Sequence, residues 1–264
     1  MSQERRYSSN LSGKSALLKE TLQVMAALTA DSSLEEVRGL VVEDNLLLKQ
    51  TMHTRRATWE AIHLRYFSGR TPSAIHILAR LAASSLPERD RHLILFYELA
   101  KSLPLVHDLT VDCLYTLYTD GRSSIDKADV LVWLDRACDD GHDEIGGWSP
   151  QTRDKVASNY LTIARDFGLL EGTQRKVLTR LYVPLPAFVY VLYRLNGEGR
   201  PTKAIVTSDS FKLFLMDQRD VYLLLDEATR AGHVTFQRAG DVYDLTFHYR
   251  DLSEVVDELT RQVQ

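Results

Sequence analysis

The segment Trp148–Gly172 encodes both ends of one helix, and it constrains the fold more than any other part of this 264-residue chain. Ser149 is a good N-cap residue, Pro150 suits the first helical position, and Gly168 suits the left-handed residue that ends a helix. Four apolar residues between these signals recur at i, i+4, i+7 and i+11: Val156, Tyr160, Ile163 and Phe167. This spacing predicts a helix that packs one narrow face against a core.

The opposite face of this predicted helix carries polar side chains of particular types. Solvated helix faces often carry Glu–Lys pairs, whereas this face carries amides, hydroxyls and cations: Gln151, Lys155, Ser158, Asn159, Thr162 and Arg165. Such side chains form hydrogen bonds with base edges and with phosphates. The composition of this face therefore predicts a DNA recognition helix.

A hairpin is expected directly after the recognition helix. Beyond Gly168 the chain passes through a turn at Glu171–Gln174 into a β-like run at Arg175–Val183, in which apolar residues alternate with others. Helix, helix, helix and hairpin is the order of a winged helix, although the acidic linker before the third helix is longer than the turn of a strict helix-turn-helix. Arg175 and Lys176 are further candidate DNA contacts.

Helical spacing fills most of the rest of the chain. It predicts helices at Leu17–Leu28, Leu34–Val41, Thr54–Phe67, Pro72–Ser84, Glu88–Ser102, Pro104–Tyr118 and Ile125–Cys138. Near the C-terminus, a helix at Gln218–Ala231 precedes a second hairpin with its turn at Ala239–Asp241, and a final helix is expected at Leu252–Val263. We therefore expect a mainly α, multi-helix protein with helix-turn-helix or winged-helix-like units and two short β-hairpin wings.

Three domains are expected. Residues 1–100 would form an N-terminal helical domain with a basic helix-turn-helix-like segment, residues 101–200 a central winged-helix-like domain, and residues 201–264 a C-terminal winged-helix-like domain. The surroundings of the second hairpin are acidic, which disfavours contact with phosphates and favours a structural or protein-binding role.

The charge of the chain alternates in blocks. The formal net charge of −4 argues against a nucleic-acid binder, but residues 45–80 hold six basic residues against one acidic, and residues 149–205 hold nine against four, so each block is +5. The intervening residues 81–148 are −7 and residues 206–264 are −5. This pattern predicts two basic surfaces, with ordinary solvated faces as the alternative. The candidate DNA contacts in the first block are Lys49, Arg55, Arg56, Arg65 and Arg70.

Signatures of catalysis, cofactor binding and metal binding are missing from the sequence. Gly13-Lys14-Ser15 lacks the earlier glycine of a phosphate-binding loop, and the eight histidines and two cysteines show neither HExxH nor zinc-finger spacing. We therefore expect no enzyme, no cofactor and no metal site. No apolar run approaches the roughly 20 residues that cross a bilayer and no secretory signal is recognisable, so we expect a cytoplasmic protein without membrane contact.

Several segments together resemble the BrxA family of bacterial BREX phage-exclusion systems. They are the turn at Asn45–Leu48, the helix with Arg55, Arg56 and Arg65 that follows it, the long helical middle, and the stretch from Trp148–Thr152 through Phe167–Leu170. The resemblance covers most of the chain. It implies a small, mostly helical, non-catalytic cytoplasmic component of a multi-protein phage-defence locus that binds double-stranded DNA, and it supplies no catalytic residues.

The function predicted from the sequence is therefore double-stranded DNA binding within a BREX system, with other BREX proteins as partners. Two alternatives stay open. A transcriptional regulator would share the winged helix, but it would act as a symmetric dimer on a palindromic site. An interaction scaffold would use the hairpins and the terminal helix to bind proteins, and it would not shift DNA.

Overall fold

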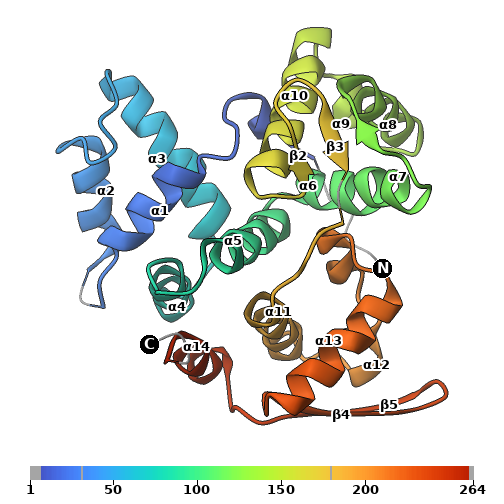
Figure 1. Cartoon of the computed structure of the whole chain (residues 1–264). Helices are drawn as coiled ribbons and strands as arrows, with labels where there is room; N and C mark the ends of the chain where they lie inside the picture. Colours follow the sequence, from blue (N-terminus) through green and yellow to red (C-terminus); the bar gives the residue numbers. More distant parts are fainter. Residues whose placement is uncertain (1–6, 31, 179, 262–264) are drawn as a thin grey trace.

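The computed structural model describes residues 7–30, 32–178 and 180–261 (Figure 1). The N-terminal part begins with a short 3-10 helix, η1 (Ser9–Ser12). It continues through α1 (Leu18–Ala27), α2 (Leu34–Val42), α3 (Met52–Tyr66), α4 (Pro72–Ala82) and α5 (Glu88–Ser102). Side-chain caps fix where two of these helices begin, because the hydroxyls of Thr51 and Thr71 accept the third amide of α3 and α4, respectively.

The middle of the chain combines short helices with a small sheet. Its first part contains α6 (Pro104–Asp108), the π-helical segment η2 (Leu109–Leu114), α7 (Tyr115–Thr119) and β1 (Ser124–Ile125). Its second part contains α8 (Lys127–Asp139), α9 (Asp143–Gly146), α10 (Pro150–Asp166), β2 (Leu170–Glu171) and β3 (Lys176–Leu178). The central strand β3 pairs antiparallel with both β1 and β2. We call residues 104–178 the central unit.

The C-terminal part repeats this order of helices and hairpin. Its elements are α11 (Leu185–Gly197), α12 (Thr202–Val206), the 3-10 helix η3 (Asp209–Phe214), α13 (Gln218–Arg230), β4 (Val234–Ala239), β5 (Val242–Phe247) and α14 (Leu252–Arg261). Strands β4 and β5 form a two-stranded antiparallel hairpin. The terminal helix α14 packs on α11 and on α4, where Arg80 and Asp257 form an ion pair of 2.9 Å.

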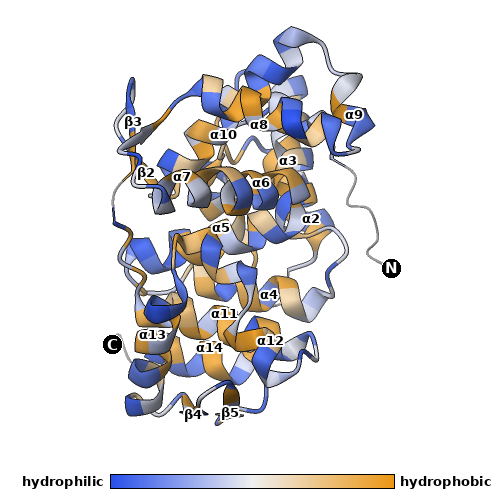
Figure 2. Ribbon diagram, turned by 90° about the vertical axis from the view of Figure 1, so that its right-hand side faces the viewer, coloured by the Kyte–Doolittle hydropathy of each residue, from blue (hydrophilic) through white to orange (hydrophobic). Residues whose placement is uncertain are grey.

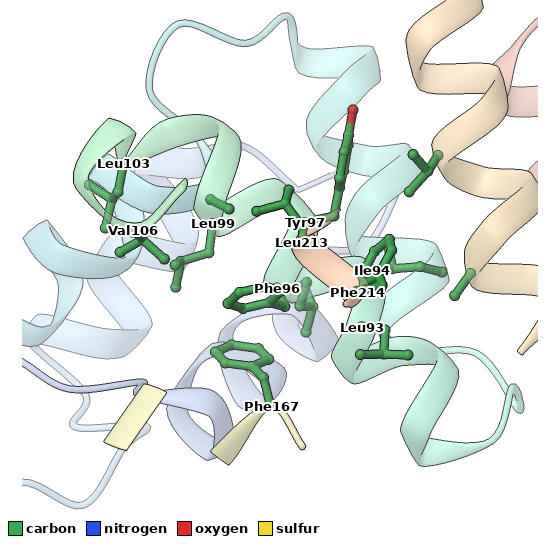
Figure 3. Packing of buried hydrophobic residues seen from close by; sticks show 14 of the residues in the cluster. Leu93, Ile94, Phe96, Tyr97, Leu99, Leu103, Val106, Phe167, Leu213 and Phe214 are labelled. Atoms are coloured by element: carbon green, nitrogen blue, oxygen red, sulfur yellow. The ribbon is translucent and has the colours of Figure 1, made fainter. Parts of the chain in front are cut away.

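Helix α5 joins the three parts of the chain. It packs against α3, η3 and α11, and Figure 2 shows it between the end of the molecule that holds α8 and α10 and the end that holds α13 and the β4–β5 hairpin. Figure 3 shows Phe96 of α5 facing Phe167, which follows α10, and their ring centroids are 5.5 Å apart. On another side of α5, the ring of Tyr97 lies 6.5 Å from that of Phe214. The buried apolar residues of all three parts form one continuous cluster.

The structure confirms the mainly α fold with two short hairpins, and it corrects several details. The helix predicted at Pro104–Tyr118 is interrupted by the π-helical segment, and Ile125 belongs to strand β1 rather than to a helix. The run predicted as a strand at Arg175–Val183 is a strand only at Lys176–Leu178 among its described residues. Helix α14 is described as far as Arg261, so the end predicted at Val263 lies outside the described residues.

The acidic stretch before α10 is more ordered than a solvated linker. Residues Asp143–Gly146 form α9, in which Ile145 is fully buried. The carboxylate of Glu144 accepts the backbone N–H of Tyr7 at 2.7 Å, and the ring of His142 stacks on that of Tyr7 with centroids 4.1 Å apart. This stretch therefore anchors the N-terminal segment. The division into three domains stays a prediction, and its first boundary falls within α5.

Candidate nucleic-acid interface

Helix α10 begins and ends where the sequence predicts. The hydroxyl of Ser149 accepts the amide of Thr152 at 3.1 Å, and Pro150 occupies the first turn. Gly168 is left-handed with φ of 82°, and the amide of Leu169 reaches back to the carbonyl of Ala164 at 2.8 Å. This pattern of bonds closes the last turn and turns the chain toward strand β2.

Helix α10 is buried over a wider arc than its predicted apolar face. Val156, Tyr160, Ile163 and Phe167 are buried as expected, but the structure also buries Ala157, Leu161 and Ala164. Helix α8, the 3-10 helix η1 and strand β2 all pack against α10. What remains in contact with solvent is one stripe, which includes the exposed residues Gln151, Lys155 and Ser158.

Three of the six residues predicted on the recognition face are occupied by contacts inside the chain. Asn159 Nδ2 donates to the carbonyl of Leu11 at 2.7 Å, and the hydroxyl of Thr162 donates to the carbonyl of Ser158 at 2.9 Å. Arg165 is paired with the neighbouring Asp166. The described residues offer Lys155 no ionic or hydrogen-bonding partner, so its charge is available to a ligand.

The β2–β3 hairpin separates its two predicted contacts. Arg175 is exposed, and among the described residues its side chain makes one long contact, 3.5 Å from Nη2 to the hydroxyl of Ser124. Lys176 turns back instead, because its ammonium donates to the carbonyls of Gly172 and Thr173 and holds the turn closed. Burial lowers the pKa of Lys176. Of this pair, only Arg175 is exposed to solvent.

The structure corrects the reading of Arg65 as a surface cation. Its side chain is 3% exposed, and its guanidinium donates to three backbone carbonyls of the segment that precedes α1: Lys14, Ser15 and Ala16. Burial lowers the pKa of this guanidinium. Arg65 therefore fastens the N-terminal segment to α3.

Arg70 and Lys49 are also engaged within the chain. The guanidinium of Arg70 lies 2.5 Å from the fully buried carboxylate of Glu98, and Lys49 Nζ lies 2.6 Å from the carboxylate of Glu20. Much of the +5 charge of residues 45–80 is thus neutralised inside the fold. The basic surface on this part of the fold is therefore smaller than the count of charges predicts.

The two adjacent arginines of α3, Arg55 and Arg56, differ in whether they are engaged within the chain. Arg55 Nη1 donates to the carbonyls of Val42 and Glu43, at 3.2 and 3.3 Å, and so caps the C-terminus of α2. Arg56 is exposed and has no partner among the described residues. The helical spacing carries a signal for this difference, since Arg55 lies three positions before Thr58 and seven before Ile62, both fully buried, whereas Arg56 lies four positions before the exposed Glu60.

Only some of the predicted DNA contacts are therefore exposed and free of contacts within the chain. Gln151, Lys155 and Ser158 share the solvent stripe of α10, and Arg175 lies on the hairpin that follows α10. Asp154 lies beside this stripe, but Lys127 Nζ is 2.6 Å from its carboxylate and offsets its charge. Arg56 lies on α3, a separate element. Among the described residues, no cluster of three or more His, Cys, Asp or Glu is arranged to hold a metal ion.

Comparison with models of known protein families identifies the family of this chain. The family model for BrxA matches residues 5–192. The chain belongs to the BrxA family. Membership implies a phage-defence protein associated with a BREX system. The matched range contains the N-terminal helices and the whole central unit of this BrxA-family chain, and residues 193–264, with the second hairpin, lie beyond it.

A solved structure shares the fold of this BrxA-family chain. It is a crystal structure of an uncharacterized protein from Magnetospirillum magneticum, with a TM-score of 0.61 and 14% sequence identity, and the match covers 80% of this chain and 100% of that one. No curated protein matches. Within the described residues, no helix is both long and apolar enough to span a membrane.

Proposed function

We propose that this chain is the non-catalytic, double-stranded DNA-binding component of a BREX phage-defence system, and that the central unit presents the DNA surface. The order of elements supports this proposal. Helices α6 to α7, strand β1, helices α8 and α10 with the short α9 between them, and strands β2 and β3 follow the order of a winged helix, and the sheet order is β1-β3-β2. In this arrangement α10 is the recognition helix and the β2–β3 hairpin is the wing.

The observation that carries the proposal is the solvent stripe of α10. Recognition helices contact base edges with residues near their N-terminus, and Gln151 and Lys155 lie in the first two turns of α10. A glutamine amide can bond adenine through two hydrogen bonds, and a lysine can bond guanine or a phosphate. Arg175, on the hairpin that follows α10, would bond the phosphate backbone beside the helix.

Phosphate contacts alone would bind DNA without regard to sequence. We therefore expect binding to any duplex, with base contacts from Gln151 adding a smaller preference. The cation Arg56 on α3 is a secondary candidate contact. We infer that the protein acts together with other BREX proteins, which follows from its family rather than from any contact described above.

Fluorescence anisotropy with a labelled duplex tests the proposal. We expect the variant Gln151→Ala/Lys155→Ala/Arg175→Ala to bind the duplex at least about tenfold more weakly than the parent chain, because a single base contact is worth about 1–3 kcal/mol. The matched control is Lys203→Ala/Arg250→Ala, which also removes two exposed cations but lies outside the central unit.

Two results would contradict the proposal. The first is equal affinity of the triple variant and the parent chain. The second is equal loss in the triple variant and in the control, which would mean that only net charge matters. Single-stranded DNA and RNA probes of the same length complete the comparison, and we expect both to bind more weakly than the duplex.

A further inference from the structure

A polar cavity lies at the junction between the central unit and the C-terminal part. Its volume is about 400 Å³, which is within the range of small-molecule sites. Helices α5 and α6 and the π-helical segment η2 line one side, and the loop before α12 and the 3-10 helix η3 line the other. Val111 and Asp112 of η2 both face this cavity. Because π-helical turns occur frequently at functional sites, their place in the wall indicates a ligand site.

The lysines and arginines around the cavity are held by acids of the chain itself. Lys101 Nζ lies 2.8 Å from one oxygen of the Glu198 carboxylate, and Arg200 Nη2 lies 2.7 Å from the other. Lys212 Nζ lies 2.7 Å from the carboxylate of Asp209 on η3. In the described part of the wall, no lysine or arginine is therefore left free to bind an anionic ligand.

One carboxylate of the wall has no counter-ion. Asp112 is exposed where η2 lines the cavity, and it forms no ion pair with any described residue. Burial and the neighbouring carboxylates of Asp108 and Asp209 raise the pKa of Asp112, although His107 and Lys212 act to lower it. Like charges beside a carboxylate disfavour its ionised form, and a bound cation would remove this cost. The charge that a ligand can still neutralise in this cavity is therefore negative.

A buried hydroxyl in the same wall also lacks a partner. Ser210 of η3 lines the cavity and is only 5% exposed, and its hydroxyl makes no hydrogen bond to any described residue. The neighbouring hydroxyl of Tyr97 is buried and is likewise unpartnered there. Buried polar groups without a partner are rare in folded proteins. Since η2 and η3 pack against each other, one ligand with several hydrogen-bond donors can reach both Asp112 and Ser210.

We propose that this cavity binds a small aliphatic amine, whose ammonium group bonds the carboxylate of Asp112 and the hydroxyl of Ser210. An ammonium group carries one positive charge and three donors, so it suits both groups at once. A metal ion suits the cavity less well, because no three His, Cys, Asp or Glu side chains of the described chain are arranged to hold one. The cavity is lined by elements other than α10 and the β2–β3 hairpin, so this proposal and DNA binding can fail independently.

Isothermal titration calorimetry of the full chain with putrescine, at constant ionic strength and without DNA, tests the proposal. We expect saturable binding of one putrescine per chain. The melting temperature should rise with putrescine concentration, because a ligand that binds only the folded state stabilises it. Asp112→Asn should weaken binding at least about tenfold, since it removes a charge-assisted hydrogen bond. Ser210→Ala should also weaken binding.

Two controls separate this site from general attraction to an acidic protein. Asp226→Asn, which changes an exposed and unpaired carboxylate on α13, should leave the affinity for putrescine unchanged. The neutral analogue 1,4-butanediol, in which hydroxyls replace the ammonium groups, should not bind. Because Asp112 is exposed, Asp112→Asn should keep the melting temperature of the parent, and it decides the test even if Ser210→Ala is less stable. The proposal is overturned by a parent chain that shows no saturable binding, by equal affinity of Asp112→Asn and the parent, by equal loss in Asp226→Asn, or by binding of butanediol as tight as that of putrescine.

Discussion

The guanidinium of Arg70 lies 2.5 Å from the carboxylate of Glu98, which is completely buried within α5. Arg194 of α11 binds the same carboxylate, with Nε 2.7 Å from Oε1, and the hydroxyl of Tyr190 donates to Oε1 at 2.7 Å. One carboxylate thus joins the segment before α4 to α5 and α11. A cation that the sequence suggests for DNA is instead a link between distant parts of the fold.

Removal of this carboxylate should destabilise the whole chain. We expect Glu98→Gln to lower the free energy of unfolding by about 3–5 kcal/mol at neutral pH, because it leaves two arginines partly buried without their counter-charge. Urea denaturation followed by circular dichroism measures the loss. As a control, Glu35→Gln changes an exposed carboxylate on α2 and should have little effect.

The contribution of Glu98 should also depend on pH. Although burial acts to raise the pKa of this carboxyl, Arg70, Arg194 and the hydrogen bonds from Arg194 and Tyr190 hold it below its usual range. The stabilisation is then fully present above the unfolded pKa of about 4.3 and is lost as the pH falls through the folded pKa. The difference in unfolding free energy between the parent and Glu98→Gln should therefore shrink below about pH 4. A difference that is constant with pH would refute this account.

The two neighbouring arginines of α3 should respond differently to the same substitution. Arg55→Glu should cost about 1.5–3 kcal/mol of stability, because it removes hydrogen bonds from a cation to the last carbonyls of α2 and places a negative charge beside them. Arg56→Glu should change stability by no more than about 0.5 kcal/mol, since Arg56 is exposed and unpaired among the described residues. Equal melting temperatures for the two variants would contradict the assignment of Arg55 as a cap.

Gly172 should tolerate substitution less well than Gly168. Both glycines are left-handed, with φ of 84° and 82°, but a Cβ on Gly172 would overlap the carbonyl oxygen of Arg175, whereas a Cβ on Gly168 meets nothing nearby. Gly168→Ala should therefore cost about 1 kcal/mol, and Gly172→Ala should cost more and displace the wing. Thermal melting compares their stability, and duplex binding by Gly172→Ala should fall as Arg175 moves. Equal stability of the two variants would be evidence against this geometry.

The buried and exposed faces of α10 make opposite predictions about stability. Tyr160 is fully buried, and its hydroxyl donates to that of Thr110 at 3.2 Å. Tyr160→Ala should cost about 3–5 kcal/mol, because it leaves a large cavity in the core. Lys155→Ala should change stability by no more than about 0.5 kcal/mol. Chemical denaturation distinguishes these outcomes, and a large loss in Lys155→Ala would show that the residue is part of the fold.

Local signals were predictable from the sequence, and long-range contacts were not. The ends of α10 follow from Ser149 and Gly168 alone, because capping depends on a few neighbouring residues. Strand β1 has only two residues and exists because it pairs with β3, about fifty positions later in the chain. No local pattern marks so short a strand, and the π-helical segment η2 is equally invisible in the spacing of apolar residues.

The candidate site was predictable only in part for a related reason. A count of charges treats every arginine as a surface residue, but Arg65 and Arg70 are held by groups that lie at least 28 positions away in sequence. Helical spacing separates Arg55 from Arg56, because it places Arg55 on the stripe of the fully buried Thr58 and Ile62. It does not reveal that Asn159 binds the carbonyl of Leu11, since that contact depends on how η1 packs on α10.

The salt dependence of duplex binding tests the central claim most directly. We expect the logarithm of the association constant to fall linearly with the logarithm of salt concentration, with a slope of about −0.9 per neutralised phosphate. If Lys155 contacts a phosphate, Lys155→Ala should reduce the magnitude of this slope by about 1, whereas Lys203→Ala, an exposed cation on α12, should leave it unchanged. A flat salt dependence, or a Lys155→Ala variant with the affinity and slope of the parent chain, would contradict the assignment of DNA binding to α10.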